Sequence, residues 1–240
     1  DEWIKERTGM SERRVITSEK LEDLAADAAR RAIEDAGIDP TDIDYIICSN
    51  VVNEYVTPGL SCIIQGKVGA KCACVDVNAA CSGFIYALDM ADDRIRSGKA
   101  KNILVVAAEE PTRMVDWNDR STCVLFGDGA GAMVVTASED GVDDIISINI
   151  QSDGSIGDII EFNLAGKNCP LVEPNTEKPL FIQMNGKEVY RFVARVLPEY
   201  VERLVADAGM KNEDIDYLIP HQANLRIIKA VQERLGYSDE

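Results

Sequence analysis

The sequence predicts an α/β fold in which helices cover a largely parallel β-sheet and the chain consists of two duplicated halves. Short apolar runs at 44–48, 74–77 and 102–108 alternate with amphipathic helices. This order gives right-handed crossovers and a parallel sheet. The pattern Asp-Ala-Gly followed by Asp-Ile-Asp-Tyr occurs at 35–47 and again, with the same spacing, at 207–219. Because a helix–turn–strand unit occurs twice, we expect two halves, residues 1–140 and 141–240.

The first half carries the clearer helix and strand patterns. A helix is predicted from Ser18, a good N-cap, to Gly37, a natural C-cap. The glycine-rich run 127–131 leads into a strand, whereas a phosphate-binding glycine loop opens a helix. We therefore interpret these glycines as a means of tight backbone packing. Further helices are expected over 58–67 and 81–98, and strands over 44–48, 74–77, 102–108 and 132–135.

The second half repeats this plan only in part. A strand is expected at 145–151, and a helix at 187–208 should kink or break at Pro198. The repeated strand at 217–219 is followed by one helix, at 225–235. If the halves are alike, the second lacks most of its sheet and the first lacks its first strand, so we expect the sequence to be a fragment. Between the strand and the long helix we expect a loop that carries Pro170, Pro174 and Pro179.

The composition limits the classes of function. The net charge of −17 at pH 7 argues against nucleic acid as the main partner. No apolar run is long enough to span a membrane. The seven cysteines are scattered along the chain, which fits a reducing cytoplasm better than a disulfide framework. Cys72 and Cys74 form a C-x-C pair, but no second pair or histidine lies nearby, so no metal site is expected.

The residues from 75 to 91 contain the best candidate nucleophile. A strand turns through Asn78 and places Cys81 where a helix begins. Unpaired N–H groups and the helix dipole favour thiolate over thiol at such a position, so the pKa of Cys81 should lie below its ordinary value. The alternative is a buried structural cysteine, since cysteine is common in protein cores.

The only histidine of the sequence, His221, is the one available partner for a Cys–His arrangement. It follows the predicted strand at 217–219 and precedes the helix at 225–235. Functional groups of α/β proteins gather at the carboxyl ends of strands, and Cys81 also follows a strand. The duplication should therefore bring the two strand ends, and these two side chains, together.

The N-terminal arm is basic and aromatic. Trp3, Arg7, Arg13 and Arg14 precede the first long helix, and by themselves they indicate a solvated arm with one packed tryptophan. The polar segment 109–122 is expected to form a surface loop.

Four segments of the sequence carry a resemblance to a known family. They are VDVNAACSGF at 75–84, FGDGAGA at 126–132, PHQANLR at 220–226, and the opening residues 1–9 with Arg13. Together they resemble the beta-ketoacyl-[acyl carrier protein] synthase III family. The resemblance implies a thiolase-like fold of two duplicated α/β halves in α-β-α-β-α layers, here with the second half incomplete. It also implies a decarboxylating Claisen condensation of an acyl-CoA primer with malonyl-[acyl carrier protein], which starts fatty acid synthesis.

The same resemblance gives roles to the two candidate catalytic residues. Cys81 matches the nucleophile that accepts the acyl group, and His221 matches the histidine that supports decarboxylation of malonate. A neutral imidazole can donate a hydrogen bond to the enolate that decarboxylation leaves.

The remaining site residues are implied as binding groups. Trp3 and Arg120 match the pair that encloses the adenine of CoA, with Arg7 near its phosphates. This replaces the interpretation of the arm as merely solvated. Asn224 belongs to the His-Gln-Ala-Asn motif beside the pantetheine tunnel, and Arg226 matches a residue that docks the acidic carrier protein.

The resemblance also has implications for cofactors and partners. It implies no permanently bound cofactor, since the CoA thioester is a substrate, and it implies a cytoplasmic homodimer. The family's asparagine, in a Gly-Asn-Thr-Ser motif beyond the histidine helix, has no counterpart here. Loss of one such donor lowers a rate by roughly 10²–10³-fold. Two alternatives stay open: a priming ketosynthase or acyltransferase of polyketide metabolism, and a truncated, non-catalytic form that binds CoA or a partner chain.

Overall fold

The computed structural model describes residues 2–139, 141–163, 171 and 180–238. The predicted loop prolines and Cys169 lie outside these residues. The chain divides into two units, each held together by internal contacts. We call Arg14–Pro111 with Gly127–Ile150 the sheet unit, and Asp1–Arg13 with Thr112–Phe126 and Gln151–Glu240 the helical unit. These units do not test the predicted duplication into residues 1–140 and 141–240.

The sheet unit contains a four-stranded sheet in the order β2-β1-β3-β4. β1 is parallel to both β2 and β3, and β4 is antiparallel to β3. The predicted parallel crossovers are therefore confirmed. The strands are β1 (Tyr45–Ser49), β2 (Ala73–Val77), β3 (Asn102–Glu109) and β4 (Gly129–Thr136), and the helices are α2 (Leu21–Asp35), α3 (Leu60–Val68) and α4 (Gly83–Arg96).

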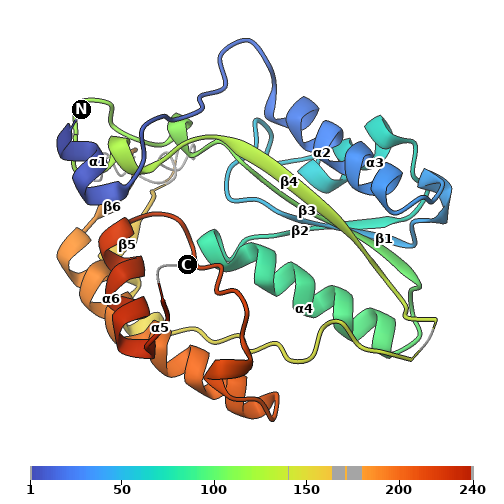
Figure 1. Cartoon of the computed structure of the whole chain (residues 1–240). Helices are drawn as coiled ribbons and strands as arrows, with labels where there is room; N and C mark the ends of the chain where they lie inside the picture. Colours follow the sequence, from blue (N-terminus) through green and yellow to red (C-terminus); the bar gives the residue numbers. More distant parts are fainter. Residues whose placement is uncertain (1, 140, 164–170, 172–179, 239–240) are drawn as a thin grey trace. The chain divides into compact units, whose positions relative to one another are not determined.

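Helices cover both faces of this sheet (Figure 1). α2 and α3 pack on the face that receives Leu104 and Val106 of β3, whereas α4 packs on the face that receives Ile103 and Val105. All four side chains are fully buried. Successive residues of a strand point to opposite faces, so an uninterrupted apolar run is what a strand covered on both sides requires. The predicted buried strand at 102–108 is confirmed.

The glycine-rich run is part of β4, so the rejection of a phosphate loop is confirmed. The explanation by tight packing is wrong for Gly129 and Gly131. A Cβ placed on Gly129 or Gly131 meets no described atom within 4 Å. The neighbouring Asp128 instead makes the close contacts, since its carboxylate accepts from Ile16 N–H at 2.7 Å and its own N–H donates to Arg14 C=O at 2.8 Å.

The helical unit is built mainly from α5 and α6, which pack against each other, and α1 contacts α6. α5 continues through Pro198, so the predicted break is not observed. No helix within the described residues has the length and apolar character needed to cross a bilayer. The elements of this unit are α1 (Glu2–Thr8), α5 (Gly186–Asp207), α6 (Leu225–Leu235) and a two-stranded sheet of β5 (Ile160–Glu161) and β6 (Gln183–Met184).

The repeated segments fold alike up to their strands. α2 and α5 both end before a left-handed glycine, Gly37 with φ +65° and Gly209 with φ +70°. Each is followed by a one-turn 3-10 helix, η1 (Pro40–Asp42) or η6 (Asn212–Asp214). In each turn the last carboxylate accepts from the N–H three residues earlier, at 3.3 Å for Asp42 and 2.9 Å for Asp214. The repeat therefore encodes the same helix ending twice.

Two predicted strands are not formed. The segments 145–151 and 217–219 lie within the described residues and have no strand structure there. β1 is held by a strand on each side, whereas Tyr217 and Ile219 are 85% and 88% exposed. A strand needs a neighbour to pair its N–H and C=O groups, and the described residues offer none to these segments.

Candidate active site

The carboxyl ends of the three parallel strands are tied together by Asn50, which follows β1. Its backbone N–H donates to Val77 C=O of β2 at 3.1 Å. Its side-chain Nδ2 donates to Ala108 C=O of β3 at 2.6 Å and to Val52 C=O at 3.1 Å. Asn50 is 7% exposed, so these bonds satisfy polar groups that water does not reach. This edge is therefore a fixed platform for the residues that follow the strands.

Cys81 is held just above this edge. It lies in the 3-10 turn η2 (Ala80–Ser82), immediately before α4. Ala80 has φ +47°, a conformation uncommon for a residue with a side chain. The next helix residue, Gly83, packs so closely on β1 that an added Cβ would overlap the Ser49 hydroxyl. A strained turn and a close glycine contact together fix the Cys81 backbone over the strand ends.

The electrostatics of Cys81 differ from the prediction. Cys81 is exposed, yet desolvation of its thiol by the surrounding protein atoms, and then the nearby charge of Glu109, raise the pKa of Cys81, although a backbone N–H acts in the opposite direction. The residue precedes α4 instead of lying within its first turn. The expected lowering of the pKa is therefore wrong for this structure, because desolvation and a carboxylate outweigh the N–H groups.

Glu109 is a site residue that the sequence did not single out. It ends β3, and Val51 N–H donates to both of its carboxylate oxygens, at 3.1 and 3.2 Å. Burial raises the pKa of Glu109 to about 7, against the lowering effect of that N–H. The same carboxylate acts on the Cys48 thiol, together with Asp76. Glu109 therefore changes charge near neutral pH next to the candidate nucleophile.

Replacing Glu109 by glutamine should make Cys81 more reactive at pH 8. Above pH 7 the wild-type carboxylate is charged and opposes thiolate formation, whereas the amide is neutral and keeps an oxygen for Val51 N–H. Alkylation of Cys81 by iodoacetamide, followed by mass spectrometry, should be a few-fold faster in the variant at pH 8 and unchanged at pH 6. Glu110→Gln, at the adjacent buried position, is the control. If the variant and the wild type were alkylated at equal rates at pH 8 as well as at pH 6, the charge of Glu109 would not act on Cys81.

The helical unit brings the predicted adenine-binding residues together. The Arg7 guanidinium lies 4.3 Å from the centroid of the Trp3 ring, and that of Arg120 lies 5.9 Å from it. Trp3 is 44% exposed, so part of its side chain is accessible to solvent.

The His-Gln-Ala-Asn segment is anchored to the same arm. Asn224 is the N-cap of α6, since its side chain accepts from Arg226 N–H at 2.9 Å. A Cβ on Gly9, which follows α1, would lie 3.3 Å from the Leu225 side chain. The end of α1 therefore packs on the start of α6, and both belong to the helical unit.

His221 directly precedes a turn at residues 222–223 that leads into α6, and the strand that we predicted ahead of it is not formed. The residue is exposed, yet burial of the imidazole lowers its pKa. A lowered pKa keeps the ring neutral at physiological pH, and a neutral ring has one N–H to donate.

The structure thus groups the predicted residues in two sets. Cys81 belongs to the sheet unit, together with Asn50 and Glu109. His221 belongs to the helical unit, which also contains the five predicted binding residues: Trp3, Arg7, Arg120, Asn224 and Arg226. Asn50 directly follows β1 and Glu109 ends β3. Both lie within two residues of the end of a predicted strand, and that position was the signal by which the sequence could have indicated them.

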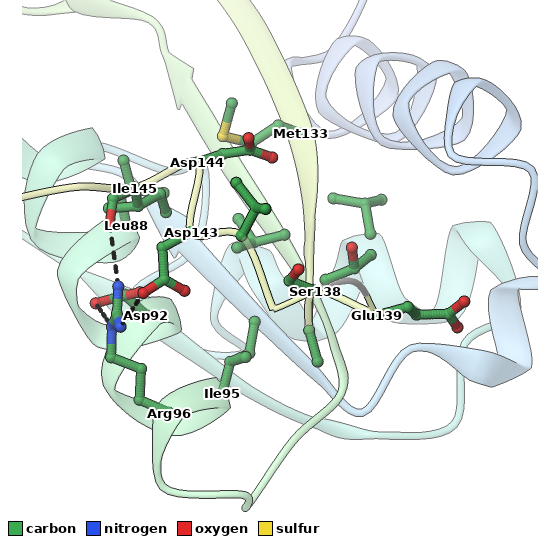
Figure 2. Close-up of a pocket in the computed structure, with 15 residues that line it drawn as sticks. Leu88, Asp92, Ile95, Arg96, Met133, Ser138, Glu139, Asp143, Asp144 and Ile145 are labelled. Carbon is green, nitrogen blue, oxygen red and sulfur yellow. Dashed lines mark hydrogen bonds and ion pairs between the residues drawn. The ribbon is translucent and has the colours of Figure 1, made fainter.

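A hollow of about 670 Å³ lies elsewhere in the sheet unit, between α4, β4 and the segment after β4 (Figure 2). Arg96 crosses one side of it and donates to Asp92, Asp143 and Ile145 C=O at 2.7–3.0 Å. None of the predicted site residues lines it. No cluster of His, Cys, Asp or Glu side chains in the described part of the chain is placed to hold a metal ion.

Comparisons with known proteins show which family the chain resembles. Two family models match, 3-oxoacyl-[acyl-carrier-protein] synthase III over residues 75–154 and its C-terminal domain over residues 205–240. The synthase III of Clostridium perfringens is 44% identical over 100% of this chain and 74% of its own length.

Solved structures give the same result. The synthase III structure from Aquifex aeolicus has a TM-score of 0.90 and 41% identity, covering 99% of this chain and 73% of that one. The priming β-ketosynthase of the R1128 polyketide pathway has a TM-score of 0.84 and 35% identity, and the match covers 99% of this chain and 71% of that one. The predicted thiolase-like fold class is confirmed. The chain belongs to the beta-ketoacyl-[acyl carrier protein] synthase III family.

Proposed function

We propose that this protein is an acyltransferase that starts fatty acid synthesis by condensing an acyl-CoA primer with malonyl-[acyl carrier protein]. The observation that carries the proposal is the position of Cys81, in a strained turn over the carboxyl ends of three parallel strands, in a member of the synthase III family. Fixed geometry of this kind is what a nucleophile needs to meet a bound thioester.

In the first step Cys81 accepts the acyl group. Its sulfur attacks the thioester carbonyl of acyl-CoA, the bond from that carbon to the CoA sulfur breaks, and CoA leaves as the thiolate. The raised pKa of Cys81 means that the resting enzyme holds the thiol, and the thiol proton passes to the departing CoA thiolate.

In the second step His221 supports decarboxylation. The malonyl thioester loses carbon dioxide, and the electron pair of the broken bond forms an enolate whose oxygen accepts a hydrogen bond from the neutral imidazole. The enolate carbon attacks the acyl-Cys81 carbonyl, a carbon–carbon bond forms, and the Cys81 sulfur leaves. The lowered pKa of His221 supports this role, because an imidazolium would supply a competing proton to the enolate.

The binding residues fit the two substrates. Trp3 offers a stacking surface for adenine, and the guanidinium groups of Arg7 and Arg120 at that surface suit the phosphates and base of CoA. Asn224 fixes the start of α6 and so orients the His221 segment. Arg226 and Lys229 are exposed one turn apart on α6 and suit an acidic carrier protein, which the net charge of −17 would otherwise repel.

Further assignments follow from family membership. We propose a cytoplasmic homodimer with no permanently bound cofactor, in which CoA enters and leaves as part of the substrate. The duplicated halves, residues 1–140 and 141–240, are proposed to carry Cys81 and His221 respectively. The second candidate function is that of a priming ketosynthase in polyketide synthesis, because the chain is 35% identical to the R1128 ketosynthase. The higher identity, 44%, to the synthase III of Clostridium perfringens favours the first.

The activity is tested by offering acetyl-CoA with malonyl groups on two carrier proteins, one from fatty acid synthesis and one from a polyketide pathway. We expect β-ketoacyl product and free CoA with the fatty acid carrier. Product with the polyketide carrier alone would favour the second candidate, and absence of product with either would contradict both.

Replacing Trp3 by alanine should raise KM for acetyl-CoA without lowering kcat. Loss of one stacked base costs about 1–3 kcal/mol, which is roughly 5- to 150-fold in affinity. Acetyl-pantetheine lacks the adenine, so wild type and variant should use it equally. Trp117→Ala, the other tryptophan and also exposed, is the matched control. A variant that loses acetyl-CoA and acetyl-pantetheine activity alike would contradict adenine stacking on Trp3.

A further inference from the structure

Three cysteines outside the proposed mechanism lie on α3, on β2 or directly before β2. Cys62 is in α3, Cys74 is in β2, and Cys72 directly precedes β2. All three are free thiols. They include the C-x-C pair, to which the proposed acyl transfer assigns no role.

Hydrogen bonds clamp α3 along β2 at two points. At one, the Asp76 carboxylate of β2 accepts from the N–H groups of Leu60 and Ser61, at 2.6 and 2.8 Å. At the other, Gln65 Nε2 donates to Cys72 C=O at 3.1 Å. The helix residue number rises from 60 to 65 while the strand residue number falls from 76 to 72, so α3 runs antiparallel to β2.

The thiols of Cys62 and Cys74 lie between these two clamps. Cys62 lies within the clamped segment 60–65 and Cys74 at the centre of 72–76, and the Cys74 thiol is within hydrogen-bonding reach of the Cys62 and Cys72 thiols. Cys74 Sγ also donates to Cys72 C=O, at 3.7 Å. The two clamps thus place Cys62 of α3 opposite Cys74 of β2, and neither clamp involves a thiol group.

The three sulfurs differ in access to solvent. Cys62 is exposed, whereas Cys72 and Cys74 are half-buried and pack against the core between α2, α3 and the sheet. Burial raises the pKa of Cys74 to about 12 and also raises that of Cys72. A small oxidant in solution therefore meets Cys62 first, and the two half-buried thiols are protected from direct oxidation.

We propose that Cys62 and Cys74 form a reversible disulfide when the protein meets a peroxide. The Cys62 sulfur attacks one oxygen of hydrogen peroxide, and the O–O bond breaks. Cys62 becomes a sulfenic acid, and the other oxygen is released as water with the thiol proton. The Cys74 sulfur then attacks the Cys62 sulfur, the S–O bond breaks, and the departing hydroxide takes the Cys74 proton as a second water. Two thiols are oxidised as one peroxide is reduced, and a dithiol reductant reverses the bond by exchange.

The disulfide would affect β2, the strand that leads into the turn holding Cys81. β2 ends at Val77, shortly before the turn that holds Cys81. A covalent bond between α3 and β2 would stiffen the strand that leads into that turn. Because the disulfide is independent of acyl transfer, its test does not depend on the proposed function.

The test uses the full chain with Cys81→Ala, so that oxidation of the nucleophile does not interfere. After brief exposure to hydrogen peroxide, free thiols are blocked with N-ethylmaleimide and the protein is digested with trypsin without reduction. Cys62 and Cys74 fall on different tryptic peptides, 32–67 and 72–94. We expect these peptides to be linked, and dithiothreitol to separate them.

Tandem mass spectrometry of the linked peptides identifies the bonded sulfurs without any further variant. Cys62→Ser and Cys74→Ser should each abolish the link, whereas Cys72→Ser, the matched control two residues along the strand, should keep it. Peroxide treatment that leaves the peptides separate, with Cys62 oxidised to sulfinic or sulfonic acid, would overturn the proposal. A link through Cys48 or Cys72 would overturn it as well.

Discussion

Replacing Cys81 by alanine should abolish condensation. Without the sulfur no acyl-enzyme forms, and removal of a catalytic nucleophile typically lowers kcat by the order of 10⁴- to 10⁶-fold. Release of CoA from acetyl-CoA in the presence of malonyl-[acyl carrier protein] measures the loss directly. The fold should be retained, because Cys81 is exposed and its turn is fixed by its neighbours Ala80 and Gly83.

The matched control for this variant is Cys62→Ala. Cys62 is also exposed and free, but it lies on α3 away from the proposed chemistry. Its activity should equal that of the wild type under reducing conditions. Substantial turnover by Cys81→Ala, or loss of turnover in Cys62→Ala alone, would contradict the assignment of the nucleophile.

Replacing His221 by alanine should separate the two half-reactions. Decarboxylation of malonyl-[acyl carrier protein] should fall by roughly 10²–10³-fold, because the enolate loses a hydrogen-bond donor worth about 3–4 kcal/mol. Transfer of the acyl group from CoA to Cys81 should remain within a few-fold of wild type. The lowered pKa of His221 means that decarboxylation in the wild type should not decline as the pH rises above 7, since the imidazole is already neutral there.

Carbon dioxide release and acyl-enzyme formation must therefore be measured separately for this variant. Gln222→Ala is the control, since Gln222 is the exposed neighbour whose amide donates to Pro220 C=O within the same segment. If His221 were a general base for the thiol, both half-reactions would fail together. A variant that cannot be acylated yet still decarboxylates would overturn the proposed role.

Much of the sheet unit could be predicted from sequence because its strands are buried on both faces. The run at 102–108 has no polar residue after Asn102, and only a doubly covered strand explains such a run. The repeat at 207–219 misled the prediction for a different reason. Its helix ending and 3-10 turn need only local hydrogen bonds and do form, but its strand needs neighbouring strands that the described residues do not supply.

The position of the nucleophile was also predictable, whereas its electrostatics were not. Strand, turn and helix around Cys81 follow from local patterns of small and apolar residues. The charge that acts on the thiol comes from Glu109, which lies 28 residues further along the sequence and reaches the site because β1, β2 and β3 end at one edge. Local sequence carries no information on such a contact.

The contacts of the N-terminal arm also could not be predicted from local sequence. Composition alone indicated a solvated basic segment, and nothing local predicted that Arg120 would lie over Trp3. The two residues meet because the segment 112–126 and α1 belong to the same unit. Only the family resemblance, which rests on the whole order of motifs, pointed to their association.

The most direct measurement of the central claim is the identity of the residue that becomes acylated. The full-length protein is exposed briefly to isotopically labelled acetyl-CoA, quenched in acid, digested and sequenced by tandem mass spectrometry. The label should appear on the tryptic peptide 72–94, at Cys81, with Cys72 and Cys74 of the same peptide unmodified. Label on Cys72, Cys74 or a cysteine of another peptide, or no covalent label in a protein that completes the condensation, would contradict it.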